Sequence, residues 1–237
     1  MALKSKRVEE VDERDLFPAD DGKFMDDTEH QVNAAMLQQS LGMWLNSQGR
    51  TVFIAADNAI YYDQNDAHKV VGPDFYVVLD TPHDPERDCW RMWNEGGHLP
   101  QLIMEFVSKH SGKKDRVTNF AIYRDILRVS NYFIWDNRRR RFDGFHLQNG
   151  TYKQLEPDAR GLYWCEALKL NVGLRDGWVR FFDTDGNLLL TGEEVAAAEE
   201  LRFREAEQRT KSLEDELARA RAEIERLKAR TPRKRRE

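Results

Sequence analysis

Two nearly continuous apolar runs of strand length constrain the fold of this chain most strongly. They are FYVVL at 75–79 and QLIMEFV at 101–107. Strands that are apolar on both faces are typical of a sheet covered by further layers on both sides. A third run of this kind, NYFIWD at 131–136, follows a segment with helical spacing at 117–129. This order of helix and strand segments predicts an α/β fold with a mixed central sheet.

The segment before these runs predicts a first helix and a β-hairpin. Thr28 and Gln31 form a capping-box pair, and the helix that follows is expected to end near Gly49. Its apolar residues at helical spacing include Val32, Met36, Met43 and Trp44. The β-rich runs at 51–56 and 59–63 are separated by Asp57 and Asn58, which predicts a hairpin.

Residues from about 140 to 192 predict a hairpin-rich extension of the same domain. Short β runs alternate there with glycine-containing turn pairs, at 143–144, 149–150, 176–177 and 185–186. We therefore expect one α/β domain over residues 27–192. Residues 1–26 are charged and poor in apolar residues, which indicates a flexible N-terminal arm.

The character of the chain changes at Glu193, where a coiled-coil helix is predicted over 193–231, before a basic tail at 232–237. Its heptad positions a are Phe203, Thr210, Leu217 and Ile224, and its positions d are Ala206, Leu213, Ala220 and Leu227. The e and g charges are opposite in sign in either direction of pairing. The pattern therefore favours self-association through 203–228 without giving the direction, and a solvated single helix is the alternative.

Composition excludes several classes of protein. The chain has 237 residues and a net charge of −5, so any contact with nucleic acid must come from local basic patches. No run approaches the roughly 18 apolar residues of a membrane span, and the N-terminus lacks the apolar core of a signal peptide. Two cysteines without metal-like spacing are consistent with a reducing compartment. We therefore expect a cytoplasmic protein without a membrane partner.

Two acidic residues on consecutive strands are the main candidates for chemistry. Asp74 follows Pro73 at the start of the first apolar run, and Glu105 lies inside the second. A buried carboxylate is costly unless it is paired, and a shared divalent cation would pair both acids. The backbone carbonyl of Phe106 is a candidate third ligand, and Asp27 at the first helix start is a candidate for holding a metal-bound water.

Basic residues directly follow the second strand. Candidates for contact with nucleic acid are Lys109, His110, Lys113, Lys114 and Arg116. Two carboxylates beside a basic helix start are typical of metal-dependent phosphodiester cleavage, which needs an activated water and neutralised phosphate charge. Each piece has a structural alternative: a turn for Pro73–Asp74, an edge carboxylate for Glu105, and a solvated loop for the basic cluster.

Two further features have both a functional and a structural interpretation. The run RRRR at 138–141 follows the NYFIWD strand, where it is either a set of phosphate contacts or a solvated turn. His30 stands near Asp27, where contact with the site is one interpretation and a surface or capping role is the expectation.

The order and spacing of several stretches resemble the Uma family of restriction-endonuclease-like proteins. These stretches are FMDDTEH (24–30), VFIAADN (52–58), VVGPDFYVVLD (70–80), WNEGGHLPQLIMEFVS (93–108), NYFIWD and DGWVRFFDTDGNLLLTGEE (176–194). The resemblance covers the chain from about Phe24 to the coil. It implies the PD-(D/E)xK nuclease core, with metal ligands at Asp74 and Glu105 and a helix-start acid at Asp27.

The chain departs from that family at one position. The lysine of the superfamily would fall at Val107, and the position that the family uses instead, on the following helix, holds Asn119. Arg116 lies one turn from Asn119 on the same helix face, and Lys113 or Lys114 would reach the site only from a loop. Arg116 can stabilise phosphate charge, but it cannot act as a base.

The sequence thus predicts a Mg²⁺- or Mn²⁺-dependent endodeoxyribonuclease that dimerises through its coil. Its candidate catalytic residues are Asp74, Glu105, Asp27, Arg116, Lys113 and Lys114. The alternative is a catalytically degenerate nuclease fold that binds nucleic acid or acts as a coiled-coil scaffold.

Overall fold

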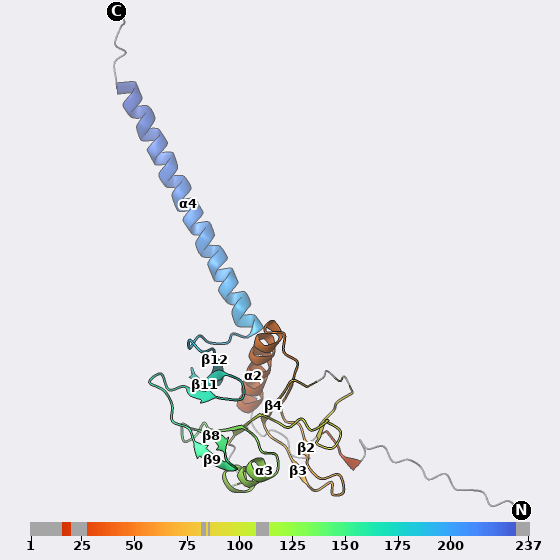
Figure 1. Cartoon of the computed structure of the whole chain (residues 1–237). Coiled ribbons are helices and arrows are strands. Elements are labelled where there is room, and N and C mark those ends of the chain that lie inside the picture. The colour runs from red at the N-terminus through yellow and green to blue at the C-terminus, as the bar shows by residue number, and fades with distance from the viewer. Residues whose placement is uncertain (1–15, 20–27, 82–83, 85, 108–113, 231–237) are drawn as a thin grey trace, which may run out of the picture. The chain divides into compact units, whose positions relative to one another are not determined.

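The computed structural model describes residues 16–19, 28–81, 84, 86–107 and 114–230. The chain divides into two compact units, the first ending at Leu189 and the second beginning at Leu190. Figure 1 labels several elements of the first unit and the helix of the second. Within the described residues, no helix is both long enough and apolar enough to cross a membrane. The cytoplasmic location stays a prediction.

The first unit is built on a six-stranded mixed sheet in the order β1-β4-β6-β7-β8-β9. Its strands are β1 (Val52–Ala55), β4 (Phe75–Leu79), β6 (Leu102–Phe106), β7 (Asn131–Asp136), β8 (Arg141–Gln148) and β9 (Thr151–Gln154). Only β6 and β7 are parallel, and the other neighbours in this sheet are antiparallel. Strands β4, β6 and β7 are buried along their whole length, as their two-sided apolar sequences predict.

Helices and a second sheet cover the central sheet. Helix α2 (Thr28–Ser47) and the sheet of β10 (Tyr163–Cys165), β11 (Leu170–Arg175) and β12 (Trp178–Phe182) share one hydrophobic core with one face of the central sheet. α2 lies beside β12 (Figure 1), and the side chain of Asn33 bonds the backbone of Val179 in both directions. A π-helix, η1 (Lys114–Asn119), leads into α3 (Phe120–Asp125), which packs on the opposite face.

A small third sheet joins the β-rich segment between α2 and β4 to the segment before β6. It has the order β3-β2-β5, with β2 (Ile60–Tyr61), β3 (Val70–Val71) and β5 (Trp90–Arg91). The second unit contains one long helix, α4 (Gly192–Arg230).

Three sequence expectations for the first unit are wrong. The runs at 51–56 and 59–63 form no hairpin, because β1 pairs with β4 and β2 pairs with β3 and β5. Asp143 and Gly144 lie inside β8 and not in a turn, since both pair with β7. The helix expected over 117–129 begins with the π-helical turn η1, and its α-helical part spans only Phe120–Asp125.

The first helix is confirmed, but its buried face is not the expected one. Val32 and Met43 are 43% and 44% exposed, whereas Leu37, Leu41 and Leu45 are buried. The buried face also carries polar residues, among them Asn33, because its side-chain amide satisfies the backbone of β12. The turn pairs at 149–150 and 176–177 do connect neighbouring strands, and all four of their residues have positive φ.

Candidate functional site

The strand register brings Asp74 and Glu105 together. In the antiparallel pair β4–β6, Phe75 lies opposite Met104 and Tyr76 lies opposite Ile103. Asp74 directly precedes β4, so it falls opposite Glu105. Directly opposed residues of antiparallel strands point to the same face of a sheet. Both acids therefore lie on the α3 face, at the edge of the sheet where β4 begins and β6 ends.

Reciprocal hydrogen bonds hold the two carboxylates against each other's strand. The backbone N–H of Asp74 donates to Oε2 of Glu105 at 3.3 Å, and the backbone N–H of Phe106 donates to Oδ2 of Asp74 at 2.5 Å. Glu105 is only 3% exposed, whereas Asp74 is partly exposed. The convergence of the two acids that the sequence predicts is therefore present in the structure.

The helix layer supplies two further donors to Glu105. Its Oε1 accepts the hydroxyl of Tyr123 at 2.6 Å and the side-chain amide of Asn119 at 3.1 Å. Asn119 ends the π-helical turn η1, and Tyr123 lies in α3 four residues later, so the two share a helix face. Because hydrogen bonds offset the cost of burying a carboxylate, these donors explain how Glu105 is tolerated inside the sheet.

The row of Asp74 and Glu105 continues across two more strands to a third acid. Glu105 lies opposite Ile134, and Ile134 lies opposite Asp143. Asp143 is buried and accepts hydrogen bonds from Arg116 at 2.6 Å and from Arg141 at 3.0 Å. Arg116, expected beside Asn119, is thus fixed on the same face of the sheet by Asp143. Its Nη2 atom is buried and has no hydrogen-bond partner in the described part of the chain.

The end of β7 carries a fourth acid, Asp136, which is buried. It accepts the backbone N–H and the guanidinium of Arg139, at 3.0 Å and 2.9 Å. Burial alone would raise the pKa of Asp136, but the hydrogen bonds from Arg139 outweigh burial and hold the pKa below its ordinary value. The turn after β7 is further tied to α2, because the amide of Asn137 donates to Glu29 at 2.7 Å.

Sequence reasoning gave too little weight to four residues at this site. Tyr123 and Asn119 bond Glu105 directly, and Asp143 fixes Arg116. The expectation of a surface role for His30 is wrong, because His30 is 6% exposed and its ring centroid lies 5.6 Å from that of Phe106. The signal for His30 was its spacing, since Ala34, Leu37 and Leu41 follow it on one face of α2.

Several predicted site residues cannot be placed by the structure. Asp27, Lys109, His110 and Lys113 lie outside the described residues, and Lys114 is described only as the first backbone position of η1. Among the described residues there is no group of three or more His, Cys, Asp or Glu side chains that could hold a metal. The adjacent carboxylates still fit Mg²⁺, which binds through one or two carboxylates and keeps several of its waters.

Comparison with known proteins places this chain in a family. The family model Uma2, described as "putative restriction endonuclease", matches residues 21–175, which confirms the resemblance drawn from the sequence. No curated protein matches the chain. Among solved structures, a "putative nuclease belonging to DUF820" from Anabaena variabilis ATCC 29413 is similar over 58% of this chain and 73% of its own, with a TM-score of 0.44 and 13% identity.

Proposed function

Because this chain belongs to the Uma2 family of restriction-endonuclease-like proteins, we propose that it is a metal-dependent endonuclease that hydrolyses phosphodiester bonds of DNA. The observation that supports this most strongly is the pairing of Asp74 with Glu105. Two carboxylates that are opposed across neighbouring strands and tied to each other's backbone offer hard oxygen ligands at one place.

In this proposal Asp74, Glu105 and the backbone carbonyl of Phe106 hold one Mg²⁺ or Mn²⁺ ion. When bound, such an ion lowers the pKa of a coordinated water and neutralises phosphate charge. Tyr123 and Asn119 orient Glu105, because both donate to Oε1 and leave the opposite side of the carboxylate facing Asp74. Asp27 at the start of the first helix is the proposed partner of a metal-bound water.

Cations on the helix layer would balance the charge of the scissile phosphate. Arg116 is the described candidate, because Asp143 holds its guanidinium on the face that carries the acid pair. Lys109, His110, Lys113 and Lys114 are proposed to contact the nucleic-acid backbone from the segment that precedes Arg116. Arginine stabilises developing phosphate charge well but stays protonated, so it supplies no general base.

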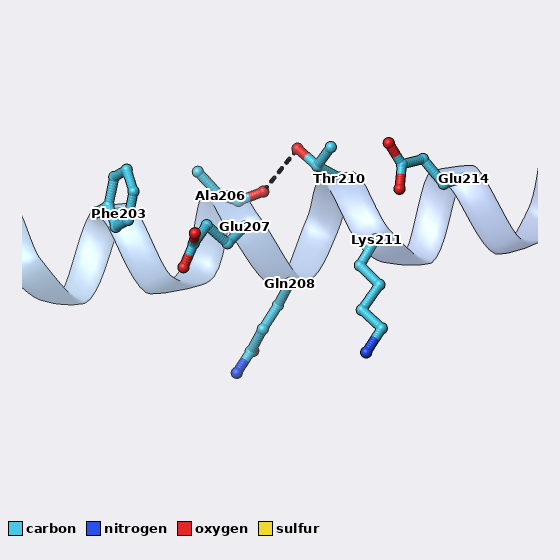
Figure 2. A pocket seen from close by; sticks show the side chains of 7 residues that line it. All are labelled: Phe203, Ala206, Glu207, Gln208, Thr210, Lys211 and Glu214. Carbon is cyan, nitrogen blue, oxygen red and sulfur yellow. Dashed lines mark hydrogen bonds between the residues drawn. The ribbon is translucent and has the colours of Figure 1, made fainter.

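Self-association through α4 would bring two such sites together, which suits the cutting of both strands of a duplex. The large apolar residues at heptad positions a and d, Phe203, Leu213, Leu217, Ile224 and Leu227, are each at least 50% exposed in the single chain. Figure 2 shows Phe203, Ala206 and Thr210 along one side of α4, where they help to line a surface hollow. A stripe of exposed apolar residues at heptad spacing favours burial against a second helix.

Two observations favour a second candidate function, a catalytically degenerate nuclease fold that binds nucleic acid or acts as a scaffold. Asn119 occupies the helix position of the family's lysine and carries no charge. In addition, Glu105 already accepts three hydrogen bonds, so its burial is compensated without a cation.

Plasmid nicking with Mg²⁺ or Mn²⁺ tests the proposal. The wild type is expected to convert supercoiled plasmid to the nicked form, and Asp74→Ala and Glu105→Ala are each expected to abolish this activity. Asp80→Asn is the control, because Asp80 is an exposed acid at the other end of β4. Nicking that survives both alanine substitutions would reject the site, and a wild type that cuts nothing would favour the degenerate alternative.

A further inference from the structure

A hollow beside the arginine-rich turn lies outside the acid pair. It has a volume of about 540 Å³ and lies between the turn after β7, the loop at 157–161 and β11. Its lining includes Arg140, Arg141, Arg160, Phe142, Tyr163 and Leu174, and none of the described residues that line it is acidic. Three arginines among the residues that line one hollow favour an anionic ligand.

The three arginines differ in how far their charge is compensated. Arg141 forms an ion pair with Asp143, and Arg160 forms one with Asp158 while also donating to the backbone carbonyl of Asp185. Arg140 forms no ion pair or side-chain hydrogen bond with any residue in the described ranges. Arg140 therefore brings an uncompensated charge to the hollow.

Two of the residues that line the hollow are aromatic and are held against each other. The rings of Phe142 and Tyr163 meet edge to face, with centroids 5.3 Å apart, and the hydroxyl of Tyr163 donates to the carbonyl of Phe142 at 2.9 Å. Leu174 is 39% exposed beside them. Apolar and cationic side chains that line one hollow fit a sugar–phosphate unit, whose deoxyribose is largely apolar and whose phosphate is charged.

The turn that carries Arg140 lies at the edge of the central sheet where the acid pair lies, although Phe142 and Tyr163 pack against the core on the opposite face from α3. Strands β6 and β7 are parallel, so the end of β7 at Asp136 lies at the same edge as Glu105, near the end of β6. The turn that carries Arg140 follows β7 directly, and Arg140 adopts a left-handed conformation there, with φ of 51°. A duplex that presents one phosphate to the acid pair and continues around this edge would therefore pass the turn that carries Arg140.

From these observations we propose that this hollow binds a backbone phosphate of a DNA duplex, one that is distinct from the scissile phosphate. The inference rests on the proposed function, because it assigns the hollow to the same substrate. Backbone contacts of this kind set the position of the duplex without reading its sequence. Arg140 is the principal contact, and Arg160 and Arg141 add positive charge from the two sides.

The test compares two matched arginine substitutions. Arg140→Asn removes the charge while asparagine tolerates the left-handed backbone. Arg128→Asn is the control, because Arg128 is an exposed arginine with φ of 50° that lies before β7, at the opposite end of that strand. Fluorescence anisotropy of a labelled duplex, measured in EDTA over a range of salt concentrations, reports binding without cleavage. Circular dichroism checks that both variants are folded.

Arg140→Asn is expected to weaken binding several-fold and to reduce the slope of log K against log salt by about 0.9, the contribution of one phosphate contact on duplex DNA. Arg128→Asn is expected to bind like the wild type. Equal binding by the two variants, or no duplex binding by the wild type, would overturn the inference. A wild type that binds duplex through Arg140 but nicks no plasmid would support this inference and reject the nuclease proposal, so the two failures are distinguishable.

Discussion

The side-chain amide of Asn119 donates to Oε1 of Glu105 at 3.1 Å. Asn119 thus contacts the acid that is proposed to bind metal, from the helix position where the resemblance to the family would place a lysine. An asparagine there orients Glu105 as a hydrogen-bond donor but brings no positive charge. This single contact links the departure from the family pattern to the proposed chemistry.

Restoring the lysine should therefore raise activity. We expect Asn119→Lys to increase the nicking rate about tenfold or more, because a preorganised cation beside a reacting phosphate typically contributes this much or more to the rate. Asn119→Met is the matched control, since methionine is also unbranched but uncharged. Initial rates of plasmid nicking measure the effect, and equal rates for the two variants would show that charge at this position does not limit catalysis.

Tyr123 should stabilise the fold more than an ordinary buried tyrosine hydroxyl does. Tyr123→Phe is expected to lower the free energy of unfolding by about 1.5–3 kcal/mol, because the lost hydrogen bond has a charged acceptor, Glu105. Tyr152→Phe is the control, since the Tyr152 hydroxyl donates to the neutral backbone carbonyl of Val129 at 3.0 Å. Its expected loss is about 0.5–1.5 kcal/mol. Urea unfolding that gives equal losses for the two variants would contradict a buried Glu105 carboxylate.

Much of the sheet was predictable because β4, β6 and β7 are buried on both faces, and such strands have nearly continuous apolar sequences. The pairing of β1 with β4 was not predictable from local pattern, because the partner strand lies beyond two short strands of another sheet. The prediction of a turn at Asp143 and Gly144 was wrong for a different reason. Its turn-like sequence is overridden by pairing with β7, where a Cβ atom would come within 2.7 Å of the Phe133 ring.

The candidate site, like the sheet, was predictable only in part. Asp74 and Glu105 could be paired because both are fixed by strand positions. The contacts of Asn119 and Tyr123 depend on where η1 becomes α3, and helical periodicity does not specify a π-helical turn. Asp143 was hidden because its sequence context indicated a turn and not a strand.

Asp136 should make the free energy of unfolding of the first unit fall as the pH becomes acidic. Its folded pKa is lowered relative to the unfolded value of about 3.9, so its contribution is fully present above that pH. The contribution is lost as pH falls through the lower folded pKa. We expect Asp136→Asn to reduce the free energy of unfolding by about 1.5–3 kcal/mol at pH 7, with a smaller reduction below pH of about 4. Urea unfolding at several pH values measures this, and a pH-independent difference would contradict the account.

The apolar stripe of α4 should hold two chains together. Leu213→Glu places a charge in the predicted seam and is expected to shift the protein from a dimer to a monomer. Ala222→Glu introduces the same residue at an exposed heptad position f and is expected to leave the dimer intact. Light scattering coupled to size-exclusion chromatography measures the mass of each variant. A monomeric wild type would reject self-association through residues 203–228.

Titration with Mn²⁺, followed by calorimetry, tests the shared metal site most directly. The wild type is expected to bind one ion at a site that is lost in both Asp74→Asn and Glu105→Gln, because each substitution removes one of the two opposed carboxylates. Asp80→Asn is the control, because Asp80 is an exposed acid that directly follows β4, at the end away from Asp74. This variant is expected to bind Mn²⁺ like the wild type. Binding that is unchanged in Asp74→Asn and Glu105→Gln, or a folded wild type that binds no Mn²⁺, would contradict the account.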